Sequence, residues 1–258
     1  MTALADATTM FGRELRHTVR YPLMLIASIV SPVVFLLLFV YVLGGPIGGG
    51  IGAAAHGAPY VDFLVPGILM MTVAAGTSTT SINVCTDMTG GIIDRFRTMA
   101  VSRGAVLSGH VGANVARTLL TTAAVTAMAL LVGFRPEATA AGWLGVAGIV
   151  LAFSVALAWL SVAFGLVAKT VAGANSATLP LQFLLPFLSS AFVPAAAMPA
   201  GIRWFAEHQP FTAVVESLRA LLAGRPAGTT GYVALAWCAA IALAGYLWAR
   251  AAFRRGTR

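Results

Sequence analysis

The sequence predicts an all-α integral membrane protein whose single domain, residues 1–258, contains six transmembrane helices. Two observations predict this class. Of the 258 residues, 59% are apolar and only 9% are charged, whereas soluble domains carry about 25% charged residues. The apolar residues also fall into six long stretches, and a helix of about 20 apolar residues crosses a bilayer core of roughly 30 Å. No segment as large as a soluble domain is left between them.

The six stretches define the predicted spans, which cover residues 22–44, 62–86, 107–134, 142–168, 174–195 and 229–250. Tyr21 and Tyr41 lie about 30 Å apart along a helix through the first stretch, which suits aromatic residues at the two membrane interfaces. This stretch is longer than the apolar core of a signal peptide, and no convincing cleavage site follows it. We therefore expect it to be retained as a span.

Two segments before the third span have one apolar and one charged helical face. Residues 7–20 combine apolar side chains with arginines, which predicts an interfacial helix along the inner membrane surface. The sequence "GGIIDRFRTMAVSR" (90–103) places Ile92, Phe96 and Met99 on one face of a short helix. This second helix either lies on the lipid headgroups or docks onto a partner.

A third amphipathic segment lies between the fifth and sixth spans, at residues 210–224. Pro210 opens it, Glu216 and Arg219 are placed to form an i,i+3 ion pair, and Gly224 is a typical C-terminal stop. The segment is too short and too charged on one side to cross a bilayer. We expect a short extracellular helix that either takes part in a gate or only caps the bundle.

The basic residues predict that both termini are cytoplasmic. Six spans put both ends of the chain on one side, and Lys and Arg accumulate on the cytoplasmic side of membranes. With that topology the inside holds Arg13, Arg16, Arg20, Arg95, Arg97, Arg103, Lys169, Arg250, Arg254, Arg255 and Arg258, and the outside holds Arg135, Arg203, Arg219 and Arg225. Residues 88–105 then form a cytoplasmic loop.

The sequence offers no catalytic, cofactor or metal site. A P-loop needs a glycine before its lysine, but the only lysine, Lys169, follows Ala168. The four histidines are far apart and form no zinc motif, and Cys85 and Cys238 lie within apolar runs. The net charge of +8 is scattered beside apolar stretches, which argues against nucleic acid as a partner.

Two rival membrane functions are weakened by the acidic residues, which all fall at span ends or in loops. A proton-coupled transporter would carry an ionisable relay within the bilayer. An integral-membrane enzyme acting on lipids would need acid, base or metal-binding residues clustered near one interface. Neither pattern is evident.

Several sequence motifs resemble ABC-2 type transporter permeases, particularly the daunorubicin-resistance branch. They are "YVDFLVPGILMMTVAAG" (60–76), "DMTGGIIDRFRTMAVSRGAVLSGHVGANVAR" (87–117) and "LLPFLSSAFVPAAAMPAGIRWFAEHQPFTAVVESLRALLAG" (184–224). Their order and spacing cover nearly the whole chain. Ala100 stands where relatives commonly have proline, and Thr89 replaces a residue that is often charged, so the details of docking can differ here.

The resemblance implies a permease subunit of an ATP-driven exporter in a bacterial plasma membrane. It would pair with a second permease, identical or related, and with two ATP-binding subunits that bind ATP and Mg. Its cargo would be a hydrophobic or amphiphilic compound such as a drug or antibiotic, with a lipid, polyketide or glycan intermediate as alternatives. Membrane lipids would surround the bundle.

The resemblance also assigns roles to residues. The inner loop would be a coupling helix that docks on the ATPase through Gly91, Ile92, Asp94, Arg95, Phe96, Arg97, Met99 and Arg103. The first, second and fifth spans would line the cargo pathway with Ser31, Met70, Thr77, Thr80, Asn83, Asn175, Gln182, Phe183, Phe187 and Ser190. The extracellular gate would comprise Pro210, Phe211, Glu216 and Arg219.

The individual polar and aromatic pathway residues have a simpler interpretation. A hydroxyl inside a span can donate to a carbonyl one turn earlier or join two helices. Aromatic and methionine side chains can pack helices together, although they also suit varied apolar cargo. The sequence leaves these alternatives open.

Overall fold

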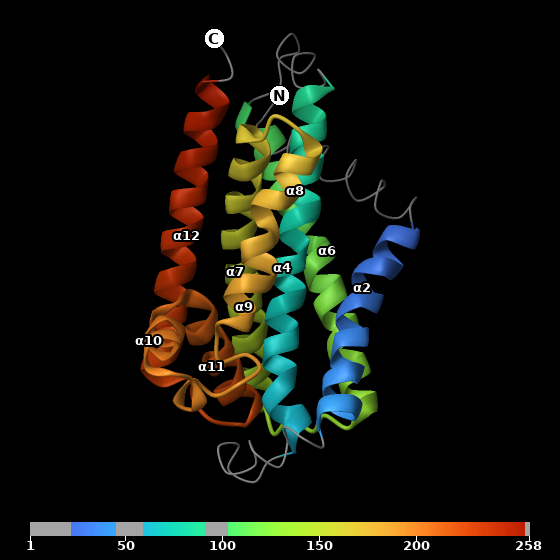
Figure 1. The fold of residues 1–258 in the computed structure, drawn as a ribbon, viewed down its shortest axis with the longest axis vertical. Coiled ribbons are helices and arrows are strands. Elements are labelled where there is room, and N and C mark those ends of the chain that lie inside the picture. Colours follow the sequence, from blue (N-terminus) through green and yellow to red (C-terminus); the bar gives the residue numbers. More distant parts are fainter. Residues whose placement is uncertain (1–21, 45–58, 91–102, 256–258) are drawn as a thin grey trace.

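The computed structural model describes residues 22–44, 59–90 and 103–255, and their regular structure is entirely helical. Four of the described helices are long and apolar enough to cross a membrane. They are α4 (Tyr60–Thr89), α6 (Arg103–Val132), α7 (Ala140–Val167) and α12 (Gly228–Arg255). They run side by side in Figure 1. This confirms an all-helical multi-pass membrane protein, while the count of six spans stays a prediction.

The predicted first and fifth spans are shorter helices interrupted by π-helical turns. The first is α2 (Pro22–Leu37), which continues into η1 (Leu38–Leu43). The fifth consists of α8 (Val171–Leu179), η2 (Pro180–Leu184) and α9 (Leu185–Phe187). We call these two the interrupted helices, and α4, α6, α7 and α12 the four-helix body.

The fifth helix ends at Phe187, earlier than the predicted boundary at residue 195, because residues 188–193 form a turn. Ser189 closes this turn with its own side chain. Its Oγ donates to the Pro186 carbonyl at 2.6 Å and accepts from the Ala191 N–H at 3.1 Å. A local side-chain bond of this kind competes with continued helix.

The central helix of the body is α7, which packs against both α4 and α12. Its sequence is apolar on every side, as expected for a helix enclosed by others. Thr139 caps its N-terminus by accepting from the Gly142 N–H at 3.2 Å. Close packing depends on small residues, because a Cβ on Gly245 of α12 would lie 2.7 Å from the backbone nitrogen of Leu160.

Two apolar clusters fill the body. The larger contains the fully buried Phe153, Leu64 and Leu218. The smaller lies where α4 ends at Thr89 and α6 begins at Arg103, which we call the loop end of the bundle. Its buried members are Val84, Leu107, Val111, Val115, Ala158, Val162, Ala163, Ala249 and Phe253.

Two short helices cover the opposite end, α10 (Ala200–His208) and α11 (Pro210–Leu222) (Figure 1). Helix α11 lies within the segment predicted to be helical, residues 210–224, and Gly224 follows it with a φ of +70° that suits glycine. Sequence reasoning missed α10. It is stabilised by exposed i,i+4 contacts, including an Arg203–Glu207 ion pair of 2.7 Å.

Candidate functional site

A polar seam joins α4 to α8. The Ser78 hydroxyl donates to Asn175 Oδ1, and the Ser81 hydroxyl donates to the backbone carbonyl of Ala174 at 3.3 Å. In a bilayer these groups have no water to bond, so leaving them unpaired would be costly. The seam therefore fastens the fifth helix to the body through hydrogen bonds.

The seam continues along the fifth helix into its π-helical turn. Thr178 donates to the carbonyl of Asn175 at 2.8 Å, and Gln182 Nε2 donates to Thr178 Oγ1 at 2.9 Å. π-Helical turns often mark functional positions. Polar atoms are thus paired next to the interruption at Pro180–Leu184.

Three threonine hydroxyls of α4 donate to backbone carbonyls of the same helix. Thr72 donates to the Ile68 carbonyl, Thr77 to that of Ala74 and Thr80 to that of Gly76, at 2.8, 2.6 and 3.2 Å. Thr77 and Thr80 are buried within the chain. For these threonines, the structure agrees with the simpler interpretation of the sequence, in which a hydroxyl donates to a carbonyl about one turn earlier.

The predicted pathway residues divide into three groups. Met70, Thr77, Thr80 and Ser190 are buried, Asn83 and Gln182 are half-buried, and Ser31, Asn175, Phe183 and Phe187 are exposed. The fifth helix brings Asn175, Gln182, Phe183 and Phe187 onto one element. The buried group packs inside the chain, so only the exposed and half-buried residues can meet a ligand in this conformation.

Both interrupted helices carry apolar side chains that their own chain leaves uncovered. On α2 and η1 these recur at every fourth residue, at Ile26, Val30, Val34, Leu38 and Val42. On the fifth helix they are Leu179, Phe183 and Phe187, between 43% and 45% exposed. We call these rows the apolar stripes. In a membrane protein such rows face lipid or another helix.

Arg219 is the central residue of the predicted gate. Its Nη1 is 2.6 Å from Glu216 Oε1, as the sequence spacing predicts, and its Nη2 donates to the carbonyls of Phe63 and Ser190 at 3.1 Å each. Its guanidinium lies 3.8 Å from the centre of the Phe63 ring, a cation–π geometry. One side chain thus ties α11 to α4 and to the turn after α9.

Burial lowers the pKa of Arg219 from its ordinary value, whereas the charge and hydrogen bond of Glu216 oppose that shift. A guanidinium titrates so far above neutral pH that it stays protonated. Arg219 therefore places a permanent positive charge on the buried side of α11. It is only 14% exposed.

The turn after α9 is also held by the start of α11. Gln209 Nε2 donates to the Leu188 carbonyl at 2.6 Å, and the Ser190 N–H donates to Thr212 Oγ1 at 3.2 Å. Phe211 is buried, and its ring meets Phe153 of α7 edge-on at 5.0 Å. Among the predicted gate residues, Pro210 opens the helix, Phe211 and Arg219 anchor it, and Glu216 is half-buried.

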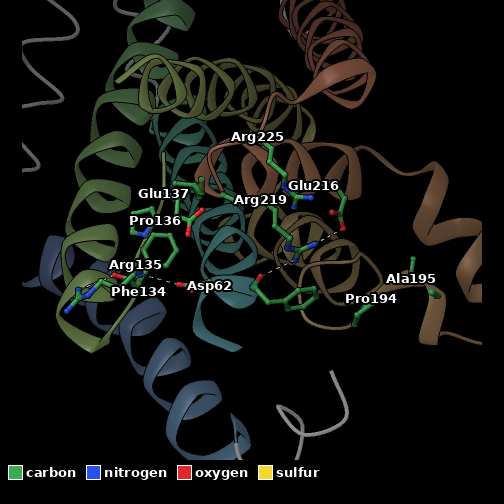
Figure 2. Close-up of a pocket in the computed structure, with 14 residues that line it drawn as sticks. Asp62, Phe134, Arg135, Pro136, Glu137, Pro194, Ala195, Glu216, Arg219 and Arg225 are labelled. Carbon is green, nitrogen blue, oxygen red and sulfur yellow. Dashed lines mark hydrogen bonds and ion pairs between the residues drawn. The ribbon is translucent and has the colours of Figure 1, made fainter. Parts of the chain in front are cut away.

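A cavity of about 780 Å³ lies beside α11 (Figure 2). It is bordered by the first turn of α4, the connection from α6 to α7, residues 194–196 and the last turns of α11. Its charged lining residues are Asp62, Glu137, Glu216, Arg135, Arg219 and Arg225. Because both signs of charge are present, the cavity suits polar or zwitterionic groups. No local sequence pattern predicted that these residues, which lie far apart in the chain, line one cavity.

Most predicted coupling residues lie outside the described residues: Gly91, Ile92, Asp94, Arg95, Phe96, Arg97 and Met99. Arg103 is the first residue of α6. The structure does describe both stems of this loop, and it brings together two residues that sequence reasoning did not pair. His110 Nε2 lies 3.3 Å from Asp87 Oδ2, and His110 is only 6% exposed.

Comparison with known proteins matches the chain over residues 6–223 to the family described as ABC-2 type transporter. It is 28% identical over 226 residues to the daunorubicin resistance ABC transporter permease protein of Streptomyces coeruleorubidus, covering 86% of this chain and 77% of that one. It is 25% identical over 241 residues to the probable doxorubicin resistance ABC transporter permease protein of Mycobacterium tuberculosis, covering 92% and 84%. An inner membrane transport permease of Escherichia coli is 26% identical over 199 residues, 75% of each chain. The matched region includes the seam, the stripes and α11.

Proposed function

Since the chain belongs to the ABC-2 type transporter family, we propose that it is the permease subunit of an ATP-driven exporter that moves a hydrophobic or amphiphilic compound, such as a drug, out of the cell. Two separate ATP-binding subunits would supply the energy. The similarity to permeases named for daunorubicin and doxorubicin resistance supports this class of cargo.

The observation that carries the proposal is the uncovered face of the fifth helix. There the exposed Asn175 of the polar seam lies on the same helix as exposed Phe183 and Phe187. A second permease, identical or related, would cover this face, and cargo would pass between the two. Polar groups beside adaptable aromatic surface suit an amphiphilic compound.

The proposed topology has six spans with both termini cytoplasmic, in which the interrupted helices cross the bilayer together with the four-helix body. The α11 end then faces outward and the loop end faces the ATP-binding subunits. The apolar stripe on α2 and η1 supports a membrane position for that helix. Residues 91–99 would dock on the ATPase as the coupling helix.

The proposal is tested by expressing the chain with candidate ABC ATP-binding subunits from its genomic neighbours and measuring ATP-dependent daunorubicin uptake into inverted membrane vesicles. We expect the ATPase to co-purify and uptake to require ATP. Replacing Phe96→Ala and Arg97→Ala together should lower ATPase capture roughly tenfold or more, because the docking helix loses an apolar anchor and a charge. Membrane insertion should remain.

Three results would contradict the proposal. One is labelling of residue 95 from the exterior of intact cells. Another is normal assembly and transport by the Phe96→Ala, Arg97→Ala double variant. The third is cargo movement by the chain without any nucleotide-hydrolysing subunit.

A further inference from the structure

A buried polar contact joins the two stems of the inner loop, linking the last turns of α4 to the first turns of α6. His110 Nε2 lies 3.3 Å from Asp87 Oδ2, and the two side chains are 6% and 14% exposed. Asp87 comes three residues before Gly90, where α4 is capped, and His110 is in the second turn of α6. The contact thus closes the base of the loop that connects these helices.

The contact lies beside the smaller apolar cluster. Leu107 and Val111 flank His110 on α6, and Val84 precedes Asp87 on α4. Apolar packing resists separation of two helices but allows small shifts along their axes, since it is not directional. The polar contact between His110 and Asp87 instead joins two particular atoms 3.3 Å apart, and it therefore favours one axial register of the stems.

The contact does not depend on one charge state of the imidazole. A neutral imidazole can carry its proton on Nε2, next to the carboxylate, and the protonated ring carries a proton there as well. The arrangement therefore fits a constant mechanical role in either state.

We propose that His110 and Asp87 are positioning residues that make α4 and α6 move as one body when the ATP-binding subunit displaces the inner loop. The inference rests on the proposed function, because only a docked ATPase would displace that loop. Without the pair, displacement of the inner loop would shift one stem along the other. Less of the motion would then be transmitted to the rest of the four-helix body. ATP would then be hydrolysed with less transport.

A double-mutant cycle in the assembled exporter tests the proposal. Asp87 has interactions beyond this pair, so His110→Ala, Asp87→Ala and the double variant must be compared with the wild type. Daunorubicin transported per ATP hydrolysed should fall roughly 5- to 10-fold in each single variant, and the double variant should be no worse, as expected when both changes remove the same polar contact. ATPase co-purification should stay unchanged.

Two further variants separate positioning from folding. His110→Gln keeps an N–H donor near the position of Nε2 and should recover most of the wild-type ratio. Thr86→Ala alters an exposed side chain in the same turn of α4 and should leave the ratio unchanged. Membrane abundance and size-exclusion profiles identify a variant that fails to fold, and His110→Gln then decides the question.

A second readout needs no ATPase. In the purified permease, His110→Ala should speed hydrogen–deuterium exchange in residues 86–89 and 107–112 together. Exchange altered in α6 alone, additive losses in the cycle, or an unchanged transport ratio in a fully assembled His110→Ala exporter would overturn the positioning role. If the wild-type complex itself shows no ATP-dependent transport, the proposed function fails, and the exchange result still decides whether the pair holds the stems together.

Discussion

The two central helices of the four-helix body, α4 and α7, differ from the interrupted helices in how their own chain covers them. In the body, α4 buries Leu64, Ile68 and Met70 completely, and α7 buries Phe153 in the same way. The interrupted helices instead leave a row of apolar side chains exposed, with Phe187 at 45% and Val34 at 53%. Helices α4 and α7 have their partners within the chain, whereas the stripes, like the outer faces of α6 and α12, are left for lipid or another protein.

The backbones of the four-helix body and of the interrupted helices also differ in regularity. The four long helices of the body are continuous α-helix, even where α4 contains Pro66, while each interrupted helix combines internal proline, such as Pro32 or Pro180, with a π-helical turn. Prolines and π-turns interrupt regular hydrogen bonding and mark kinks and functional positions. Under the proposed function, the body would supply stability and the interrupted helices would supply the surface that meets cargo.

The largest effect on stability is expected where the body is tied to the turn after α9. Arg219→Met should lower the free energy of unfolding by about 2–4 kcal/mol, because the buried carbonyls of Phe63 and Ser190 lose their shared donor. Arg225→Met is the matched control: this exposed arginine lines the same cavity, and its loss should stay within about 0.5 kcal/mol. Unfolding in detergent measures both. Equal effects would show that Arg219 is not an anchor.

A second test of the body uses two glycines of α7. A Cβ at Gly165 would lie 2.6 Å from the Ser81 carbonyl oxygen and 2.8 Å from Val84 Cβ, whereas nothing lies within 4 Å of one at Gly148. Gly165→Ala should therefore destabilise the protein by about 1–3 kcal/mol, since α4 and α7 must separate. Gly148→Ala should be neutral or stabilising by up to about 1 kcal/mol, because alanine favours helix. Equal free energies of unfolding for the two variants in the same denaturation assay would disprove close packing at Gly165.

The division between body and interrupted helices was only partly predictable. Long uninterrupted apolar runs predicted α4, α6, α7 and α12, and the Pro210 and Gly224 signals predicted α11. These features are local, since each depends on residues within one helix. The π-helical turns were not foreseen, because η1 has no proline to mark it and η2 lies against α4, which is distant in sequence. The end of α9 at Phe187 was missed because it depends on the side-chain bonds of Ser189.

The site was less predictable than the fold because its contacts join distant residues. Arg219 bonds to Phe63, 156 positions away, and His110 meets Asp87 across the loop. No periodicity within one helix reveals such pairs, although the ion pair of Arg219 with Glu216 was evident from its i,i+3 spacing. The roles of the cargo-pathway residues stay predictions.

A third test concerns the stripes. Phe183→Ala should leave the unfolding free energy within about 0.5 kcal/mol, since the side chain is 43% exposed and lies outside the buried core. If a second permease covers this stripe, association should weaken roughly 5- to 10-fold, or about 1–1.4 kcal/mol. Leu243→Ala on α12, where the side chain is 59% exposed, is the control and should not change association. Fluorescence energy transfer between labelled copies in vesicles measures this association. Equal association of the Phe183→Ala and Leu243→Ala variants would show that both residues face lipid.

The smallest effect is expected at the polar seam, where the body meets the fifth helix. Ser78→Ala and Asn175→Ala should show a coupling of about 0.6 kcal/mol in a double-mutant cycle, the average for hydrogen bonds between membrane helices. The value is small because a separated Ser78 can still donate to a carbonyl of its own helix. A weak tie of this kind lets the fifth helix move against the body without unfolding it. A coupling well above about 2 kcal/mol, the upper end for such bonds, would instead make the fifth helix part of the rigid body.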